Sequence, residues 1–155
     1  MRLLFTVLFF IPVILAGQSL EPTKGDKLIE IRATQPDSIL YRLAGRSLLN
    51  AGYTFKADKE SLTMFIEEKP LRKWPSYLLT SQLSVHNNSI RLTGNLRNTI
   101  RYTLGGASAE ADSFPVEYRR GNTVMQRAGF LQLIEMAAII QKAITGSVIT
   151  YYSKP

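Results

Sequence analysis

The sequence contains no cysteine, and its 155 residues include one histidine, His86, and one tryptophan, Trp74. The absence of cysteine excludes a disulfide-stapled scaffold and all thiol chemistry. With a single histidine, the chain also lacks the sets of thiolate and imidazole ligands that zinc sites use. The fold must therefore be stabilised by packing alone, and we expect neither a metal ion nor another cofactor.

Motifs of nucleophilic and phosphate chemistry are also missing. A Ser–His pair would have to use His86, which stands beside Asn87-Asn88 at a predicted hairpin turn, and no G-x-S-x-G nucleophile elbow occurs. Gly105-Gly106 has neither the spacing nor the following lysine of a phosphate-binding loop. We therefore predict no catalytic residue, and we interpret His86 as a solvent-facing turn residue.

Charge is absent from residues 3–17, LLFTVLFFIPVILAG, which follow the basic residue Arg2. The apolar run in this stretch has about 13 residues, whereas a helix needs about 20 to span a bilayer. A basic start, a short apolar run and small residues at its end are the parts of a secretory signal peptide. We predict that residues 1–17 are a signal peptide cleaved near Ala16/Gly17, so that the protein is secreted or periplasmic. A buried N-terminal helix or an uncleaved anchor is the alternative.

Cleavage would leave a flexible lead-in at 18–26 and a single domain at 27–153, with no transmembrane segment in the mature chain. The formal net charge of the whole chain is +7, and loss of Arg2 leaves +6 (7 − 1). A small domain with this charge is soluble without any ligand. A cysteine-free exported domain of this kind is typical of a bacterial envelope, since small secreted domains often depend on disulfides.

Alternating apolar and polar residues predict strands within 27–34, 53–58, 61–68, 77–86 and 89–97, of which the last continues toward 104. Helical spacing predicts one helix from about 38 to 51, capped by Asp37 or Ser38, and a longer helix over 123–145. Residues 114–120 suit a short edge strand or a loop, and 147–153 a last strand or a tail. This order predicts an α+β fold, a two-layer sandwich of an antiparallel sheet with helices packed on one face.

The predicted helix at 123–145 is apolar on nearly all sides, because Leu131, Met136, Ala138 and Ile139 add to its main apolar stripe. Such a helix needs cover on nearly all sides. We therefore expect either a homodimer through this helix or its full burial within one chain.

Three segments carry a resemblance to a known kind of protein: KLIEIRAT at 27–34, ILYRLAGRSLLNAGY at 39–53 and FLQLIEMAAIIQKAI at 130–144. Their order, with the strand run between them, resembles small exported bacterial domains of uncharacterised families. The resemblance covers most of the mature chain and implies a fold similar to the TATA-box-binding-protein-like fold. It rests on no specific motif, so no functional residue is carried over, and DNA binding does not follow from fold alone.

Arginines recur on the outward face of the strand that begins at 89. Arg91, Arg97 and Arg101 share one parity, and Arg119, Arg120 and Arg127 are candidates to extend the group. Guanidinium groups bind phosphates and carboxylates through two hydrogen bonds. This set predicts a site for an acidic glycan, a lipid headgroup or an acidic protein, and its alternative is a solvated sheet face. Nucleic acid would be attracted as well, but we expect none as a partner of an exported chain.

A second candidate surface is the segment KPLRKWPSY at 69–77, in which Arg72, Lys73 and Trp74 stand between two prolines. Tryptophan and arginine are common hot spots of binding interfaces, so this segment is a candidate for contact with a partner or a membrane interface. The alternative is that Trp74 folds back as a lid on the edge of the core.

Paired carboxylates give a third hypothesis. Glu67 and Glu68 are adjacent, so a regular strand would direct them to opposite faces. A hydrolase would require Glu117 to converge with one of them, as glycoside hydrolysis requires two carboxyl groups at a set separation. The sequence thus predicts a non-enzymatic binding or structural module of the cell envelope. The alternatives are a binder of acidic polysaccharide or lipid headgroups and a carboxylate-dependent hydrolase.

Overall fold

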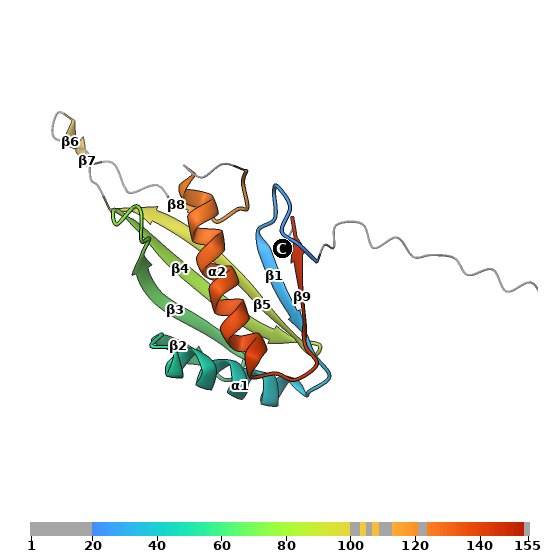
Figure 1. Ribbon diagram of the computed structural model, residues 1–155. Coiled ribbons are helices and arrows are strands. Elements are labelled where there is room, and N and C mark those ends of the chain that lie inside the picture. Colours follow the sequence, from blue (N-terminus) through green and yellow to red (C-terminus); the bar gives the residue numbers. More distant parts are fainter. Residues whose placement is uncertain (1–19, 100–102, 105–106, 109–112, 121–123, 154–155) are drawn as a thin grey trace, which may run out of the picture.

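The computed structural model describes residues 20–99, 103–104, 107–108, 113–120 and 124–153 (Figure 1). The predicted signal peptide, 1–17, lies outside the described residues. The elements in chain order are β1 (Leu28–Arg32), α1 (Asp37–Asn50), β2 (Phe55–Asp58), β3 (Thr63–Pro70), β4 (Tyr77–His86), β5 (Ser89–Asn98), β6 (Thr103–Leu104), β7 (Ala107–Ser108), β8 (Ser113–Pro115), α2 (Met125–Lys142) and β9 (Val148–Tyr152).

Seven of the strands form one antiparallel sheet in the order β2-β3-β4-β5-β1-β9, with β8 also paired to β5. Strand β5 pairs with β4 along its whole length, from Ser89 opposite His86 to Asn98 opposite Tyr77. Its other edge is divided, because β1 occupies the part near Leu92 and β8 the part near Leu96. The alternation predicted to continue toward 104 stops at Asn98, and β6 pairs only with β7.

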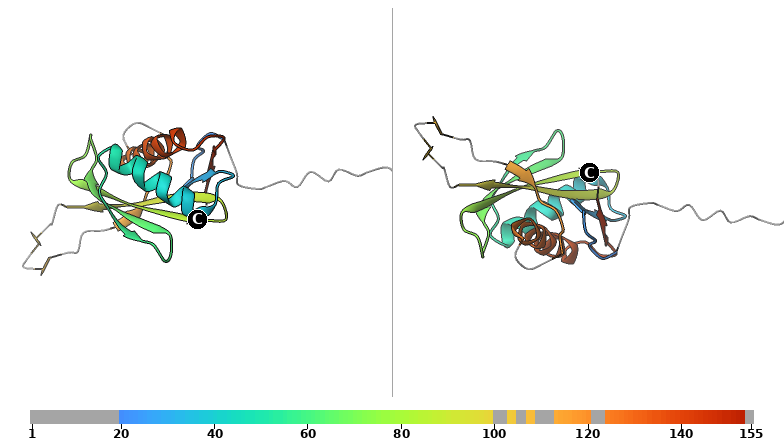
Figure 2. Two further views of the ribbon diagram at one scale, coloured as in Figure 1. Left: turned by 90° about the horizontal axis from the view of Figure 1, so that it is seen from below. Right: turned by 90° about the horizontal axis from the view of Figure 1, so that it is seen from above.

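Both described helices lie on the same side of the sheet (Figure 2). Their apolar residues pack on strand residues of one parity, among which Ile29, Ile31 and Leu92 are fully buried. Helix α2 runs over β5 and β1, and α1 crosses near one end of β4 and β5 and contacts α2. The predicted α+β fold, a two-layer sandwich with helices on one face, is thus confirmed.

The start of α1 differs from the prediction that Asp37 or Ser38 caps it. Pro36 holds the cap position, and no side chain caps the helix. The Asp37 carboxylate instead accepts hydrogen bonds from the backbone N–H groups of Asn87 (3.1 Å) and Asn88 (2.7 Å). Both asparagines have positive φ, as a tight two-residue hairpin turn requires. Asp37 therefore ties the first helix to the β4–β5 turn.

Helix α2 is shorter than the predicted 123–145 segment and begins at Met125. Its fully buried side chains include Phe130 and Leu133, and Ile134 and Ile139 are half-buried. Leu131 remains 42% exposed. The chain itself thus covers most of this apolar helix, and the homodimer stays a prediction.

Two glycines allow α2 to lie close to β5. A Cβ atom at Gly94 of β5 would lie 3.1 Å from both Leu79 Cδ1 and Val116 Cγ2, and one at Gly129 of α2 would lie 3.1 Å from Val116 Cγ1. These distances are shorter than ordinary carbon–carbon contacts. The helix and the sheet therefore approach each other across positions that have no side chain.

This close approach predicts that Gly94→Val destabilises the fold by about 1–3 kcal/mol, because overpacking a tight core forces side chains and backbone to shift. The matched control is Asn95→Val, at the neighbouring exposed position of the same strand, which should change stability by less than about 0.5 kcal/mol. Urea unfolding of the two variants and the original chain measures the difference. Equal stability of the Gly94→Val variant and the original chain would show that the packing is looser than described.

Candidate binding surface on the open face of the sheet

No described element covers the sheet face opposite the helices. The strand register places Lys56, Phe65, Gln82 and Thr93 in one row across β2, β3, β4 and β5, at the parity opposite to the core. Phe65 is 49% exposed in the middle of this row. An aromatic side chain in such a position is unusual on a face of polar residues, and it marks the open face as a candidate for contact with a partner.

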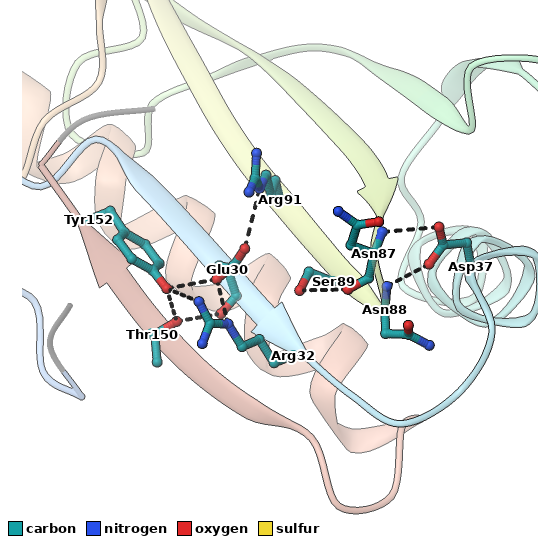
Figure 3. A network of polar contacts seen from close by, with 9 residues as sticks. All are labelled: Glu30, Arg32, Asp37, Asn87, Asn88, Ser89, Arg91, Thr150 and Tyr152. Carbon is teal, nitrogen blue, oxygen red and sulfur yellow. Dashed lines mark hydrogen bonds and ion pairs between the residues drawn. The ribbon is translucent and has the colours of Figure 1, made fainter. Parts of the chain in front are cut away.

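A buried carboxylate lies on the same face beside this row. Glu30 of β1 is 3% exposed, although a strand residue of its parity is expected in solvent. Its Oε2 accepts hydrogen bonds from Arg32 Nε (2.8 Å) and the Tyr152 hydroxyl (2.7 Å), and its Oε1 from Arg91 Nε (3.3 Å) (Figure 3). Arg32 also donates to the Tyr152 hydroxyl at 2.6 Å. Three neighbouring strands, β1, β5 and β9, thus converge on one acid.

The surroundings of Glu30 act on its pKa in opposite directions. Burial raises the pKa, but hydrogen bonds from Tyr152, Arg32 and Arg91 and the charge of Arg32 together lower it below its ordinary value. Glu30 is therefore a carboxylate in the folded protein. Burial, with the hydrogen bond to Glu30 and its charge, raises the pKa of Tyr152, so the hydroxyl keeps the proton that it donates.

The two arginines that hold Glu30 remain near half exposed and border a hollow of about 280 Å³. The hollow reaches the β4–β5 turn, where His86 is exposed as predicted. Arg91 binds Glu30 through Nε, one of the five N–H donors of its guanidinium. The arrangement resembles a fixed array of hydrogen-bond donors and contains no nucleophile–base pair.

The predicted arginine ladder is present on the structure only as a set of ion pairs. Arg97 binds Glu68 through two hydrogen bonds, at 3.2 and 2.7 Å, and Arg91 binds Glu30 through one, at 3.3 Å. Arg119 Nε lies 3.4 Å from Glu117 Oε1. Arg91, Arg97 and Arg119 are thus each paired with a glutamate.

The other predicted members of the ladder lie elsewhere. Arg120 is exposed, and no ion pair to it occurs within the described part of the chain. Arg127 is part of α2, with its guanidinium 5.5 Å from the centre of the Tyr118 ring, so its proposed addition to the sheet face is wrong. Arg101 lies outside the described residues.

The segment with Arg72, Lys73 and Trp74 lies beside α2 instead of on the open face. Trp74 is half-buried against the core, and Arg72 Nη2 pairs with Glu135 Oε2 at 3.3 Å. All three residues line a hollow of about 200 Å³ against α2, together with Leu131. Trp74 therefore covers the edge of the core, and the exposed Arg72 and Lys73 remain candidates for partner contact.

The three carboxylates of the hydrolase hypothesis have different partners. A register shift in β3 falls between Ile66 and Lys69, and within it Glu67 accepts from the Thr54 hydroxyl at 2.6 Å. Glu68 binds Arg97, and Glu117 lies 3.9 Å from Lys27 Nζ. No cluster of three or more histidine, aspartate or glutamate side chains suited to a metal ion occurs among the described residues. In the same part of the chain, no helix is long and apolar enough to cross a bilayer.

Sequence reasoning missed Glu30 as a member of a site, because the alternation of 27–34 assigns it to a solvated face. The signal for its burial is spread over the chain: Tyr152 is 122 residues away and Arg91 is 61 residues away. Strand β9, in a segment that the sequence predicted as either a strand or a tail, supplies the hydroxyl of Tyr152. Only the register of β1 between β5 and β9 brings the three groups together.

No protein-family model and no curated protein match the sequence. Among solved structures, the chain is similar to a TBP-like protein from Parabacteroides distasonis, with 11% sequence identity and a TM-score of 0.47. The similarity covers 83% of this chain and 99% of that one. It assigns no ligand to the open face.

Replacement of Glu30 tests the network. Glu30→Gln should destabilise the fold by about 1–3 kcal/mol at pH 7, because two arginines lose their negative partner and one of the two accepting oxygens becomes an NH2 group that cannot accept a hydrogen bond. The lowered pKa means that the carboxylate stabilises the fold above its ordinary pKa of 4.5, and that this stabilisation is lost as the pH falls through the lowered value. The difference between the two proteins should therefore shrink below about pH 4.5.

Urea unfolding at a series of pH values measures this difference. Glu68→Gln is the matched control, since it removes a carboxylate from a more exposed arginine pair on the same face and should have a small effect. Equal losses in both variants, or a loss at Glu30→Gln that is independent of pH, would contradict the assignment.

Proposed function

We propose that the protein is an exported, non-catalytic binding domain and that the open face of its sheet contacts another envelope protein. The observation that carries this proposal is the combination of an uncovered sheet face with Phe65, an exposed aromatic residue on β3, the second strand from one edge of the sheet. Exposed aromatic residues within a polar surround are typical anchors of protein interfaces. The rigid strands on either side hold this side chain in place without any ordering step on binding.

The charges of the open face favour a protein partner over a polyanion. Arg91, Arg97 and Arg119 each have a glutamate partner, so both signs alternate over the surface. A polyanionic glycan or a layer of lipid headgroups would have to compete with these carboxylates. A protein surface with charges of both signs can complement such a pattern, which gives orientation and specificity.

The alternative of a hydrolase has less support. The hydrolysis of a glycosidic bond requires two carboxyl groups that face one substrate, one of which keeps a proton near neutral pH. Glu67, Glu68 and Glu117 are each engaged by a different neighbour. Glu30, the buried carboxylate of this face, has a lowered pKa, whereas a general acid needs a raised one.

A photocrosslinking residue placed at Phe65 tests the proposed contact in living cells that produce the full chain. The matched control position is Leu131, which is 42% exposed against 49% for Phe65 but lies on α2 in the helix layer. We expect a discrete crosslinked species from position 65 and none of the same mass from position 131. A discrete species from position 131 alone would place the interface on the helices and contradict the proposal, as would the lack of any species from both positions.

The same contact predicts a loss of affinity once the crosslinked partner has been identified. Phe65→Ser should weaken binding by about tenfold or more, since truncation of a central aromatic anchor removes a hot spot. Leu131→Ser should leave the affinity unchanged. Calorimetric titration with the purified partner measures both values, and equal affinities of the two variants would show that Phe65 is not part of the interface.

The proposed compartment rests on the charge-free stretch 3–17 and its small residues. Mass spectrometry of the protein recovered from its own cells should find a mature chain that starts at Gly17 or Gln18. Recovery of an intact N-terminus at Met1 would contradict export by a cleaved signal peptide. Replacement of Ala16 by a bulky residue should slow the cleavage, because signal peptidase sites require small side chains.

A further inference from the structure

A second surface lies away from the open face, between α1 and the hairpin of β2 and β3. Here the structure has a hollow of about 610 Å³, within the range of pockets that hold small molecules. Its lining is largely apolar and comes from both elements, with Leu49 of α1 opposite Phe55, Leu62 and Met64 of the hairpin. Leu49 lines the cleft and is 58% exposed.

The floor of this cleft depends on Gly45. A Cβ atom there would lie 2.9 Å from Met64 Cε and 3.4 Å from Phe55 Cζ. The missing side chain thus lets the hairpin residues lie directly against the backbone of α1. The Tyr41 hydroxyl is hydrogen-bonded to the carbonyl oxygens of Asp58 (3.2 Å) and Thr63 (3.3 Å), which fixes the hairpin to the helix beside the cleft.

Leu62, which also lines the cleft, has a strained backbone. Its φ of 49° lies in the left-handed region, where a branched side chain is rare. The N–H of Val85 donates to the Leu62 carbonyl at 3.0 Å and holds this conformation. Strained residues that persist in a fold often mark a functional position, and here the strain places an apolar side chain at the edge of the hollow.

Three cations surround the apolar lining: Arg42 and Arg46 of α1, and Lys59 in the β2–β3 turn. None of them has an ion pair within the described part of the chain, whereas Arg91, Arg97 and Arg119 of the open face all have one. Asp58 stands next to Lys59 in the sequence, but its carboxylate accepts bonds from the Ser61 hydroxyl (2.7 Å) and the N–H of Glu60 (3.0 Å). The rim therefore has positive charge to offer to a ligand.

We propose that this cleft binds a small amphiphile, an unbranched acyl chain that ends in an anionic group. The acyl chain of the ligand lies between Leu49 and the hairpin, and its anionic group binds Arg42 and Arg46 through charge-assisted hydrogen bonds. An uncharged chain uses only the apolar lining, and a small anion uses only the rim. The combination of both on one surface selects a molecule that has both parts. This site is separate from the open face, so the two proposals stand or fall independently.

Calorimetric titration of the purified full chain tests the proposal, with octanoate, decanoate and dodecanoate kept below their micelle concentrations. We expect a single site whose affinity rises about fourfold for each added methylene that is buried. Butyrate and 1-decanol, which each have one of the two parts, should bind at least tenfold more weakly than decanoate. Dodecyl phosphate separates a phosphate-ended from a carboxylate-ended source, since the tighter of the two anions identifies the headgroup that the rim prefers.

Substitutions in the cleft and beside it test whether decanoate binds at this site. Leu49→Glu should abolish decanoate binding, because it puts a negative charge in the apolar lining of the cleft. Ile39→Glu is the matched control, since Ile39 is an exposed apolar residue (36%) of the same helix that does not line the cleft, and it should bind as the original chain does. Arg42→Gln combined with Arg46→Gln should weaken decanoate binding about tenfold and leave decanol binding unchanged, whereas Arg120→Gln should change neither. Circular dichroism confirms that each variant is folded.

Three results would overturn the proposal. The first is equal binding of decanoate by the Leu49→Glu and Ile39→Glu variants. The second is the absence of saturable binding with any chain length. The third is a dimer, detected by sedimentation, that Leu49→Glu dissociates while decanoate does not bind, since the cleft would then be an interface between two copies.

Discussion

The side-chain parity of β5 determines the rest of the structure. This strand is hydrogen-bonded along both edges, to β4 on one side and to β1 and β8 on the other. Its even-numbered residues, such as Leu92, lie under the helices, and its odd-numbered residues, such as Arg91 and Arg97, lie on the opposite face. A shift of one residue would exchange the two faces. One register thus separates a dry core from a polar surface and brings each described arginine of β5 next to a glutamate.

The two candidate surfaces differ in whether their basic side chains have acidic partners. On the open face, Glu30, Glu68 and Glu117 stand among the arginines and form ion pairs with them, so the surface carries charges of both signs. At the cleft beside α1, cations surround an apolar lining without an ion pair in the described part of the chain. The surface of mixed charge suits a macromolecular partner, and the unpaired rim suits a single anionic group.

Local patterns were enough to predict the sandwich, because alternation and helical spacing are themselves products of one-sided burial. The strand expected at 77–86 is β4 without a change in its bounds, and the paired asparagines after it form the turn. What could not be predicted depends on residues far apart in the chain. The burial of Glu30 requires Tyr152 from the other end of the described chain, and Arg97 is paired with Glu68 of a strand that only the tertiary register brings near. The charge pattern of residues 89–97 is the same whether or not partners exist, so sequence alone could not separate a free ladder from a paired one.

The place of β9 has a consequence for the order of folding. In chain order, strand β1 comes before both of its neighbours in the sheet, β5 and β9, and a long stretch of sequence separates it from each of them. Until Val148–Tyr152 is available, β1 has an open edge and Glu30 lacks the hydroxyl that helps to bury it. Closure across such a long sequence separation is slow, because the entropy of the whole intervening loop must be lost first. We therefore expect the pairing of β1 with β9 to be a late step in folding, and the edge of β1 and the Glu30 carboxylate to stay accessible to water until then.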